Sequence, residues 1–261
     1  MENPLAIVTG ASTGIGYELA RCCADAGFDL LIAADEPEIE AAARRLGEGG
    51  RVVTAIEADL ATIEGVDKLC DAIGGRPVSV LCANAGRGLG RGFLDQNFTD
   101  IRRVIDTNVT GTVYLLHHIG RQMVSTGSGR ILITGSIAGF MPGTFQAVYN
   151  ASKAFLDSFA AALREEIKGS GVTVTCLMPG PTDTEFFRRG DLMDTKIGVE
   201  EKMSAAEVAQ QGFETMMNGE ANVITGFRNK MQVAMSRVMG SETLAEKHRK
   251  EAEPGTAKKV S

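Results

Sequence analysis

The chain has 261 residues, of which 44% are hydrophobic and 23% charged, and its formal net charge is −6. This length and apolar content suffice for one large α/β domain with a buried core. The acidic balance argues against nucleic-acid binding, and no apolar run approaches the roughly 18 residues that span a bilayer. Met1-Glu2-Asn3-Pro4 lead directly into a predicted strand, so we expect no signal peptide.

Short apolar runs alternate with segments of helical periodicity, which predicts a parallel sheet with helices packed against it. The predicted strands cover residues 5–8, 29–33, 51–56, 78–83, 130–134 and 172–177. The predicted helices cover residues 14–26, 36–46, 63–73, 98–125 and 149–168. The strand ends should meet at one edge of the sheet, where α/β sheets bind ligands; they fall at Gly10, Ala34, Asn84, Ser136 and Met178.

The first predicted turn is rich in glycine. Residues 9–16 read Thr-Gly-Ala-Ser-Thr-Gly-Ile-Gly, after an apolar run and before a helical pattern. Glycines allow a tight turn and close backbone approach, and a helix N-terminus attracts phosphate. The spacing differs from Gly-x-Gly-x-x-Gly, and a glycine cluster alone could be a flexible turn. Its position between a strand and a helix favours a pyrophosphate site.

Tyr149 and Lys153 are four residues apart in a predicted helix, so their side chains share one face. A free phenol has a pKa of about 10, too high for efficient acid–base chemistry near neutral pH. An ammonium one turn away is expected to lower that pKa. Ser136 would hydrogen-bond a substrate oxygen while Tyr149 gives or takes its proton. None of the three can carry a hydride, so this chemistry requires a cofactor.

Over about residues 5–184 the chain resembles the short-chain dehydrogenase/reductase family. The resemblance rests on the glycine segment and on Asp59, Asn84-Ala85-Gly86, Asn108, Ser136, Tyr149, Lys153 and Pro179-Gly180, in family order. It implies a Rossmann-type fold, a doubly wound parallel sheet in three α/β/α layers, with NAD(P)(H) as cofactor. It also implies that Asn108 joins the Ser-Tyr-Lys site, kinks its helix and holds a water in a proton relay to the Lys.

The resemblance also implies which residues bind the cofactor. Asp59 resembles the residue beside the adenine, although it could instead cap a helix. Thr182 through its backbone and Thr184 through its hydroxyl are expected to contact the nicotinamide carboxamide. The full expected set is Gly10, Ser12, Thr13, Gly14, Ile15, Gly16, Asp35, Asp59, Leu60, Asn84, Ala85, Gly86, Tyr149, Lys153, Pro179, Gly180, Thr182 and Thr184.

Coenzyme choice depends on the end of the second strand, where an acidic group binds the ribose 2′-hydroxyl and repels a 2′-phosphate. Asp35 and Glu36 stand there, and the family's usual phosphate-binding positions carry Thr13 and Asp35 instead of Lys or Arg. We therefore expect NAD(H). NADP(H) remains the alternative, because the commonest NAD-selecting position holds Ala34. Asp35 could also cap the next helix, with Pro37 in its first turn.

Three segments are expected to form the substrate pocket, residues 87–93, 137–146 and 185–193. They suggest an apolar, medium-sized pocket because they supply Phe140, Met141, Phe145, Phe186 and Phe187. Four arginines could bind an acidic substrate, but a solvated charged face explains them equally well; they are Arg87, Arg91, Arg188 and Arg189.

The C-terminal region departs from the most familiar family pattern. We expect a single domain over residues 1–226, ending in a short strand at 221–226, and a helical extension over 227–261. Met231, Met235, Val238 and Met239 recur there at helical spacing. Such a stripe is expected to pack on the domain or on a partner subunit, in preference to forming a lid or a membrane-surface helix. The resemblance implies a homodimer or homotetramer.

Cysteines and histidines give no sign of a metal site. None of the five cysteines belongs to a Cys-x-x-Cys pair, and most lie in apolar runs, as in a reduced, cytoplasmic protein. His117-His118 lies in a helical stretch without carboxylate or Cys partners at ligand spacing. We therefore expect no bound metal.

Two classes of function remain. The first is an oxidoreductase that transfers a hydride between nicotinamide and a small carbonyl compound or secondary alcohol, including an NADP(H)-dependent ketone reductase. The second is a nucleotide-binding sensor on the same fold. Sensors of that type tend to lose the Tyr or the Lys, whereas this chain keeps Asn108, Ser136, Tyr149 and Lys153. The enzyme is the favoured hypothesis.

Overall fold

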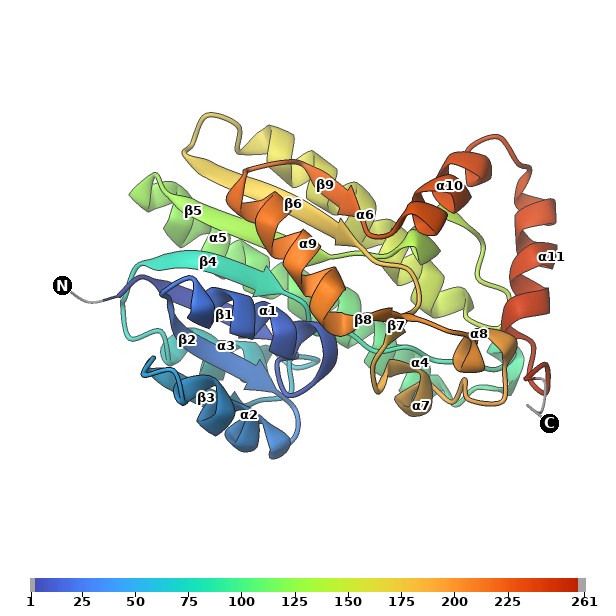
Figure 1. Cartoon of the computed structure of the whole chain (residues 1–261), viewed down its shortest axis with the longest axis horizontal. Helices are drawn as coiled ribbons and strands as arrows, with labels where there is room; N and C mark the ends of the chain where they lie inside the picture. The colour runs from blue at the N-terminus through green and yellow to red at the C-terminus, as the bar shows by residue number, and fades with distance from the viewer. Residues whose placement is uncertain (1–2, 258–261) are drawn as a thin grey trace.

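The computed structural model describes residues 3–257 and is built around a seven-stranded sheet (Figure 1). All neighbouring strands are parallel, in the order β3-β2-β1-β4-β5-β6-β9. Their bounds are β1 Leu5–Thr9, β2 Asp29–Ala34, β3 Val53–Glu57, β4 Val78–Ala83, β5 Gly129–Thr134, β6 Val172–Met178 and β9 Asn222–Ile224. The prediction of a Rossmann-type, doubly wound sheet is confirmed.

Helices cover both faces of the sheet, which gives three layers (Figure 1). One face carries α1 (Gly14–Asp25), α2 (Glu38–Gly47) and α9 (Ala205–Met217). The other carries α3 (Ile63–Asp71), α5 (Thr112–Thr126) and α6 (Ala147–Glu166), and α4 (Phe98–Ile105) packs beside α6. Shorter elements lie beyond the strand ends: β7 (Thr182–Asp183), α7 (Phe186–Arg189), α8 (Lys196–Val199), β8 (Met203–Ser204), α10 (Phe227–Ser236) and α11 (Ser241–Ala252).

Apolar side chains fill the space on both sides of the sheet. Successive strand residues point to opposite faces, so Ile7 and Leu81 join the core under α3, α5 and α6. Val8 and Cys82 join the core under α1, α2 and α9. A parallel sheet buried on both faces therefore needs the continuous apolar runs that the sequence contains.

Side-chain hydrogen bonds tie three strand ends together where the strand order reverses between β1 and β4. The Thr9 hydroxyl accepts the backbone N–H groups of Asn84 and Ala85, both at 3.0 Å. Asn84 Nδ2 donates to the Thr9 carbonyl at 3.1 Å, and Thr134 Oγ1 donates to Asn84 Oδ1 at 3.0 Å. Ligands of open α/β sheets bind at this switch point.

The helix predicted over residues 98–125 is interrupted. A π-helical segment, Asp106–Gly111, lies between α4 and α5. The apolar pattern of the sequence did not reveal this segment, although the family resemblance implied a kink at Asn108. Such π-helical turns are frequent at functional sites. Asn108 lies in this segment and is fully buried.

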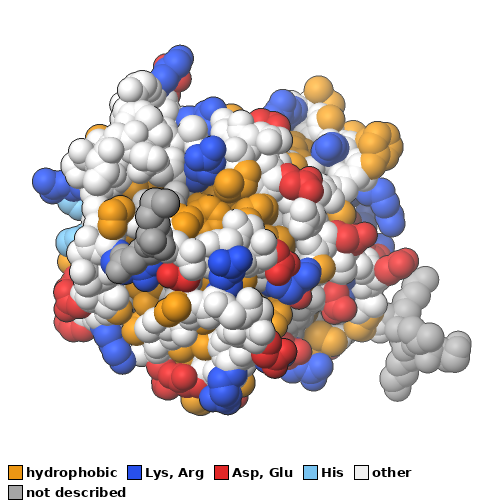
Figure 2. Space-filling model, turned by 60° about the vertical axis from the view of Figure 1, so that its left-hand side comes forward, with side chains coloured by type: hydrophobic (Ala, Val, Ile, Leu, Met, Phe, Trp, Pro, Cys, Tyr) orange, Lys and Arg blue, Asp and Glu red, His pale blue; other side chains and the backbone are white. Residues whose placement is uncertain are grey.

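The C-terminal extension forms α10 and α11, and residues 258–261 of the expected range lie outside the described residues. Val233 of α10 is buried, whereas Met231, Met235 and Val238 are exposed. Within residues 3–257, no helix combines the length and apolarity needed to cross a bilayer. Figure 2 shows a face on which basic side chains lie among acidic ones, so this face has no continuous basic surface.

Candidate active site

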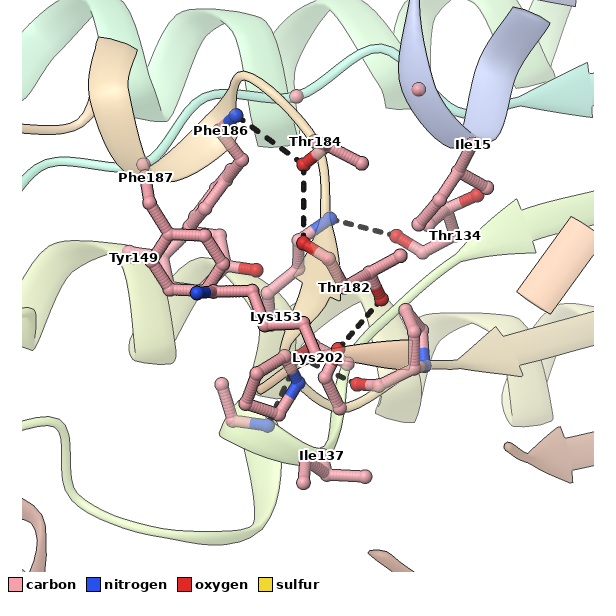
Figure 3. A pocket seen from close by; sticks show the side chains of 18 of the residues that line it. Ile15, Thr134, Ile137, Tyr149, Lys153, Thr182, Thr184, Phe186, Phe187 and Lys202 are labelled. Atoms are coloured by element: carbon pink, nitrogen blue, oxygen red, sulfur yellow. Dashed lines mark hydrogen bonds between the residues drawn. The ribbon is translucent and has the colours of Figure 1, made fainter. Parts of the chain in front are cut away.

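The carboxyl ends of the strands open into a cavity of about 850 Å³ (Figure 3). Every residue of the expected cofactor-binding set lines this cavity, and so does Ser136. Figure 3 shows Tyr149, Phe186 and Phe187 gathered on one side and Ile15 of α1 on the other. Asn108 is not part of the lining, because it lies buried behind it.

The glycine turn suits close approach of a ligand to the backbone. Gly10 and Gly14 have φ angles of +65° and +59°, which favour glycine. A Cβ on Gly16 would collide with the carbonyl oxygen of Gly10, so α1 can pack this closely only with glycine there. Thr13 makes no side-chain cap, which leaves first-turn N–H groups of α1 for an anion. These residues fit the pyrophosphate of a dinucleotide.

At the end of β2, Asp35 pairs with two arginines. Arg87 and Arg103 both contact its carboxylate, the latter at 3.1 Å, and Arg103 also contacts Asp59 at 3.1 Å. Burial acts to raise the pKa of Asp35, but hydrogen bonds and charge from the arginines outweigh it and hold that pKa below its usual value. The helix-cap alternative for Asp35 is wrong, because α2 begins at Glu38 with Pro37 in the N-cap position.

Asp59 does not cap α3 either. The α3 N-cap is Thr62, whose hydroxyl accepts the backbone N–H of Gly65. Asp59 instead accepts the N–H of Ala61 at 3.1 Å and lines the cavity.

The four arginines considered for an acidic substrate all pair with carboxylates of the chain. Arg87 pairs with Asp35, Arg91 with Asp191 and Asp194, Arg188 with Glu185 and Arg189 with Glu36. Their charges are therefore balanced within the protein. This favours the structural explanation over a role in binding an anionic substrate.

Ser136 and Tyr149 lie next to each other at the inner end of the cavity. Ser136 Oγ accepts the N–H of Ala138 at 3.1 Å and contacts the Pro179 carbonyl at 3.3 Å. The Tyr149 ring packs against Phe186, with ring centroids 4.9 Å apart. Burial raises the pKa of Tyr149 to about 12, although a hydrogen bond with Ser136 acts in the opposite direction.

Lys153 is buried below Tyr149. Its Nζ donates to the Thr134 carbonyl at 2.8 Å and lies 5.9 Å from the centroid of the Tyr149 ring. Burial lowers the pKa of Lys153 to about 8. The prediction that Lys153 lowers the Tyr149 pKa is therefore wrong for the protein without a coenzyme. The removal of solvent from the phenol has the larger effect, and it raises this pKa.

Asn108 connects two walls of the site. Its Oδ1 accepts the N–H of Arg87 at 2.7 Å, and its Nδ2 donates to the Arg87 carbonyl at 2.9 Å. Nδ2 also donates to Ser152 Oγ at 3.0 Å, on the helix that carries Tyr149 and Lys153. The π-helical segment thus fixes the loop after β4 relative to α6.

Of the five apolar residues predicted to form the substrate pocket, three line the cavity and two lie outside it. Met141, Phe186 and Phe187 line the cavity, and the rings of Phe140 and Phe145 do not. Cationic groups cover those two rings instead: Arg237 lies 5.9 Å from the first and Arg249 lies 5.4 Å from the second.

The sequence analysis gave a lid only as the less favoured role of the C-terminal extension, but α10 and α11 form the outer wall of the cavity together with the segment before β8. Its residues include Lys196, Lys202, Phe227, Arg228, Asn229, Gln232, Lys247, His248 and Glu251. Thr144 holds α11 in place, because its hydroxyl donates to the Ala245 carbonyl and its own carbonyl contacts His248 Nδ1, both at 2.8 Å. No chemical motif in residues 227–257 signals this placement.

The described residues show no arrangement of three or more His, Cys, Asp or Glu side chains that could hold a metal ion. The rings of His117 and His118 contact each other edge to face, with centroids 5.9 Å apart. All five cysteines are free, and four of them are buried.

Comparisons with known proteins agree with this geometry. A family model described as short chain dehydrogenase matches residues 4–194. Sulfoacetaldehyde reductase 2 of Chromohalobacter salexigens is 36% identical over 190 residues, which are 70% of this chain and 75% of that protein.

Two solved structures illustrate the likeness in fold. A short-chain dehydrogenase from Sphingobium yanoikuyae in complex with NADPH superposes with a TM-score of 0.80 at 29% identity, over 90% of this chain and 95% of that one. A short-chain dehydrogenase/reductase from Burkholderia phymatum in complex with NAD has a TM-score of 0.83 at 22% identity, over 92% and 96% of the two chains. Structures similar to this chain thus hold either coenzyme.

Proposed function

Because the chain belongs to the short-chain dehydrogenase/reductase family, whose enzymes interconvert C=O and CH–OH groups with a nicotinamide coenzyme, we propose that Ser136, Tyr149 and Lys153 are its catalytic residues. The substrate is a small carbonyl compound or the corresponding secondary alcohol. The observation that carries the proposal is that these three side chains share one cavity of about 850 Å³ with the glycine turn.

The cofactor-binding set defined above would hold the coenzyme. The N-terminus of α1 would receive the pyrophosphate, Asp35 and Asp59 the adenosine part, and Thr182 and Thr184 the nicotinamide carboxamide. A bound nicotinamide supplies or accepts the hydride. Binding and orientation belong to the protein.

Ser136 and Tyr149 would act on the substrate oxygen. With its pKa raised to about 12, Tyr149 is a protonated phenol at neutral pH, the form that can give a proton to a carbonyl oxygen during reduction. Ser136 would hydrogen-bond the same oxygen and hold it beside the phenol. In the oxidation direction Tyr149 would take the proton back.

Lys153 would stabilise the negative charge that appears on Tyr149 as its proton leaves. Burial works against this role, because it lowers the Lys153 pKa to about 8. Lys153 would also reach a ribose hydroxyl of the coenzyme. Asn108, which bonds Arg87 and Ser152, would support a proton relay toward Lys153.

We propose NAD(H) as the preferred coenzyme, because Asp35, an acidic residue, lines the cavity directly after β2. One observation favours the alternative, NADP(H): Arg87 and Arg103 flank Asp35 and could bind a 2′-phosphate if that carboxylate turned away. The similar structure that holds NADPH is consistent with this alternative.

We also propose a cytoplasmic homodimer or homotetramer made of one domain, residues 1–226, and a helical extension. The free cysteines support a reducing compartment. The exposed apolar residues of α10 support burial against another subunit. Light scattering of the purified protein measures the number of subunits.

The experiment that tests the proposed activity is oxidation of NADH and NADPH by wild-type protein with a panel of ketones and aldehydes that includes sulfoacetaldehyde. Turnover of any member supports the reductase, and the coenzyme with the higher kcat/KM decides the preference. Tight coenzyme binding without turnover across the panel would favour a nucleotide sensor. Failure to bind either coenzyme would contradict the dinucleotide site itself.

A further inference from the structure

Asp157 is a charged residue next to the catalytic groups that the proposed chemistry does not use. It lies on α6 one turn after Lys153, so Tyr149, Lys153 and Asp157 are spaced four residues apart along one face of the helix. Asp157 does not line the cavity. Its carboxylate therefore acts on its neighbours and not directly on a substrate.

The Asp157 carboxylate is inserted into the turn that follows β5. Its Oδ1 accepts the backbone N–H of Ser136 at 3.2 Å and lies 3.5 Å from Cys176 Sγ. A Cβ on Gly135 or Gly139 would collide with this carboxylate, so the turn contains glycine on both sides of Ser136. A single side chain thus connects the segment that carries Ser136 to the helix that carries the other two catalytic residues.

The same carboxylate is electrostatically linked to Lys153. Among the described residues, its Oδ2 is buried without a hydrogen-bond partner. Burial raises the pKa of Asp157 to about 6, and the Ser136 N–H and the Lys153 charge oppose this rise. Reciprocally, the Asp157 charge opposes the lowering of the Lys153 pKa by burial.

Few other ionisable groups act on Asp157. Cys176 of β6 faces it, and burial and the Asp157 charge keep that thiol protonated by raising its pKa far above the usual value. On α6, the Asp157 charge also raises the pKa of Tyr149, after the larger effect of burial. The turn after β5 contributes only the backbone of Ser136 and the two glycines.

We propose that Asp157 is a positioning residue of this active site: its carboxylate holds Ser136 against α6, and its negative charge keeps Lys153 in the ammonium form. The inference rests on the proposed function, since it assigns Asp157 a role through Ser136 and Lys153. Two variants separate the two roles. Asp157→Asn removes the charge but keeps an acceptor for the Ser136 N–H, whereas Asp157→Ala removes both.

The effect of the Asp157 charge on Lys153 can be tested without turnover, by ¹³C NMR titration of the Lys153 ε-carbon in the purified protein. The signal of this carbon is assigned by its absence from the spectrum of Lys153→Met. In wild type we expect a midpoint near the Lys153 pKa of about 8, and a second, smaller change when Asp157 is protonated near pH 6. In Asp157→Asn the midpoint should fall by about one pH unit. Asp67→Asn, which removes a carboxylate bonded to Tyr114 on another face, should leave it unchanged.

Kinetics provide the second readout. At pH 8 we expect kcat of Asp157→Asn to be about fivefold below wild type, because the ammonium fraction of Lys153 falls from about one half to about one tenth, with little change in KM. At pH 6 this deficit should largely disappear, because Lys153 is then protonated in both proteins. Asp157→Ala, which also loses the contact to Ser136, should remain impaired at both pH values.

An unchanged Lys153 midpoint in Asp157→Asn, or a deficit that is equal at pH 6 and pH 8, would overturn the proposal and leave Asp157 a packing residue. Should Asp157→Asn fail to fold, the wild-type titration decides: absence of the second change near pH 6 would overturn the proposal. If wild type turns over no carbonyl compound, the proposed function fails, while the NMR titration still decides the link between Asp157 and Lys153.

Discussion

Tyr149 and Lys153 lie one helical turn apart, and burial shifts their pKa values in opposite directions. It raises the pKa of Tyr149 to about 12 and lowers that of Lys153 to about 8. Both shifts favour the neutral forms, as expected where solvent is removed from a charged group. The pair is therefore suited to donate a proton at neutral pH, provided that Lys153 remains an ammonium.

This predicts how the reduction rate depends on pH. Lys153 loses its proton as the pH rises through about 8, so kcat for carbonyl reduction should be halved near that pH and reach its plateau about one to two pH units below it. Steady-state assays at saturating coenzyme measure the profile. Lys202→Met is the matched control, because Lys202 also lines the cavity and burial also lowers its pKa. A wild-type profile that is flat to pH 10, or loss of the decline in Lys202→Met, would refute the assignment to Lys153.

A second prediction concerns Asp35. Asp35→Ser removes the carboxylate that pairs with Arg87 and Arg103, so both arginines become available to a 2′-phosphate. We expect the ratio of kcat/KM for NADPH to that for NADH to rise by about tenfold, or about 1.4 kcal/mol. Asp25→Ser, at an exposed carboxylate outside the cavity, should not change the ratio. An unchanged ratio in Asp35→Ser would mean that Asp35 does not select the coenzyme.

Helix α1 packs directly against the turn that follows β1. The backbone of Gly16 packs against Gly10, and Asn84 fills the space beside both. The glycine turn therefore depends on contacts between β1, α1 and β4. A small side chain at this junction should displace the N-terminus of α1.

Gly16→Ala is accordingly predicted to weaken coenzyme binding by about tenfold or more and to destabilise the fold by about 1–3 kcal/mol. Binding can be followed by NADH fluorescence, which no tryptophan of this chain disturbs. Gly49→Ala is the control, since a Cβ there meets no atom within 4 Å. Normal NADH affinity in Gly16→Ala would contradict the placement of the pyrophosphate.

The outer wall gives a prediction for α11. His248 lines the cavity and contacts the Thr144 carbonyl, so His248→Ala should raise KM for the carbonyl substrate by about three- to tenfold through loss of this anchor. The Kd for NADH should be unchanged, because the wall lies away from the glycine turn. Lys250→Ala, on the exposed side of the same helix, is the control. A change in NADH affinity without a change in KM would show that α11 belongs to the coenzyme site.

Apolar runs that alternate with segments of helical periodicity were sufficient to predict the sheet and most helices. A strand that is buried on both faces is apolar along its whole length, and this is easily recognised in the sequence. The π-helical segment around Asn108 was not predicted from periodicity, although the family resemblance implied a kink at that residue. The α11 wall was not favoured from the sequence because a contact such as Thr144 to His248 joins residues 104 positions apart. The Tyr149 pKa was predicted in the wrong direction because sequence spacing reveals neighbouring charges but not the depth of burial.

We propose that one cavity joins a dinucleotide site to a separate proton donor. The most direct test compares NADH binding and carbonyl reduction in wild type and Tyr149→Phe. We predict that Kd for NADH changes by less than about twofold, since the ring and its contact with Phe186 are kept. We also predict that kcat falls by about 10²- to 10⁴-fold, the usual contribution of a general acid. Undiminished reduction by Tyr149→Phe would show that Tyr149 is not the proton donor.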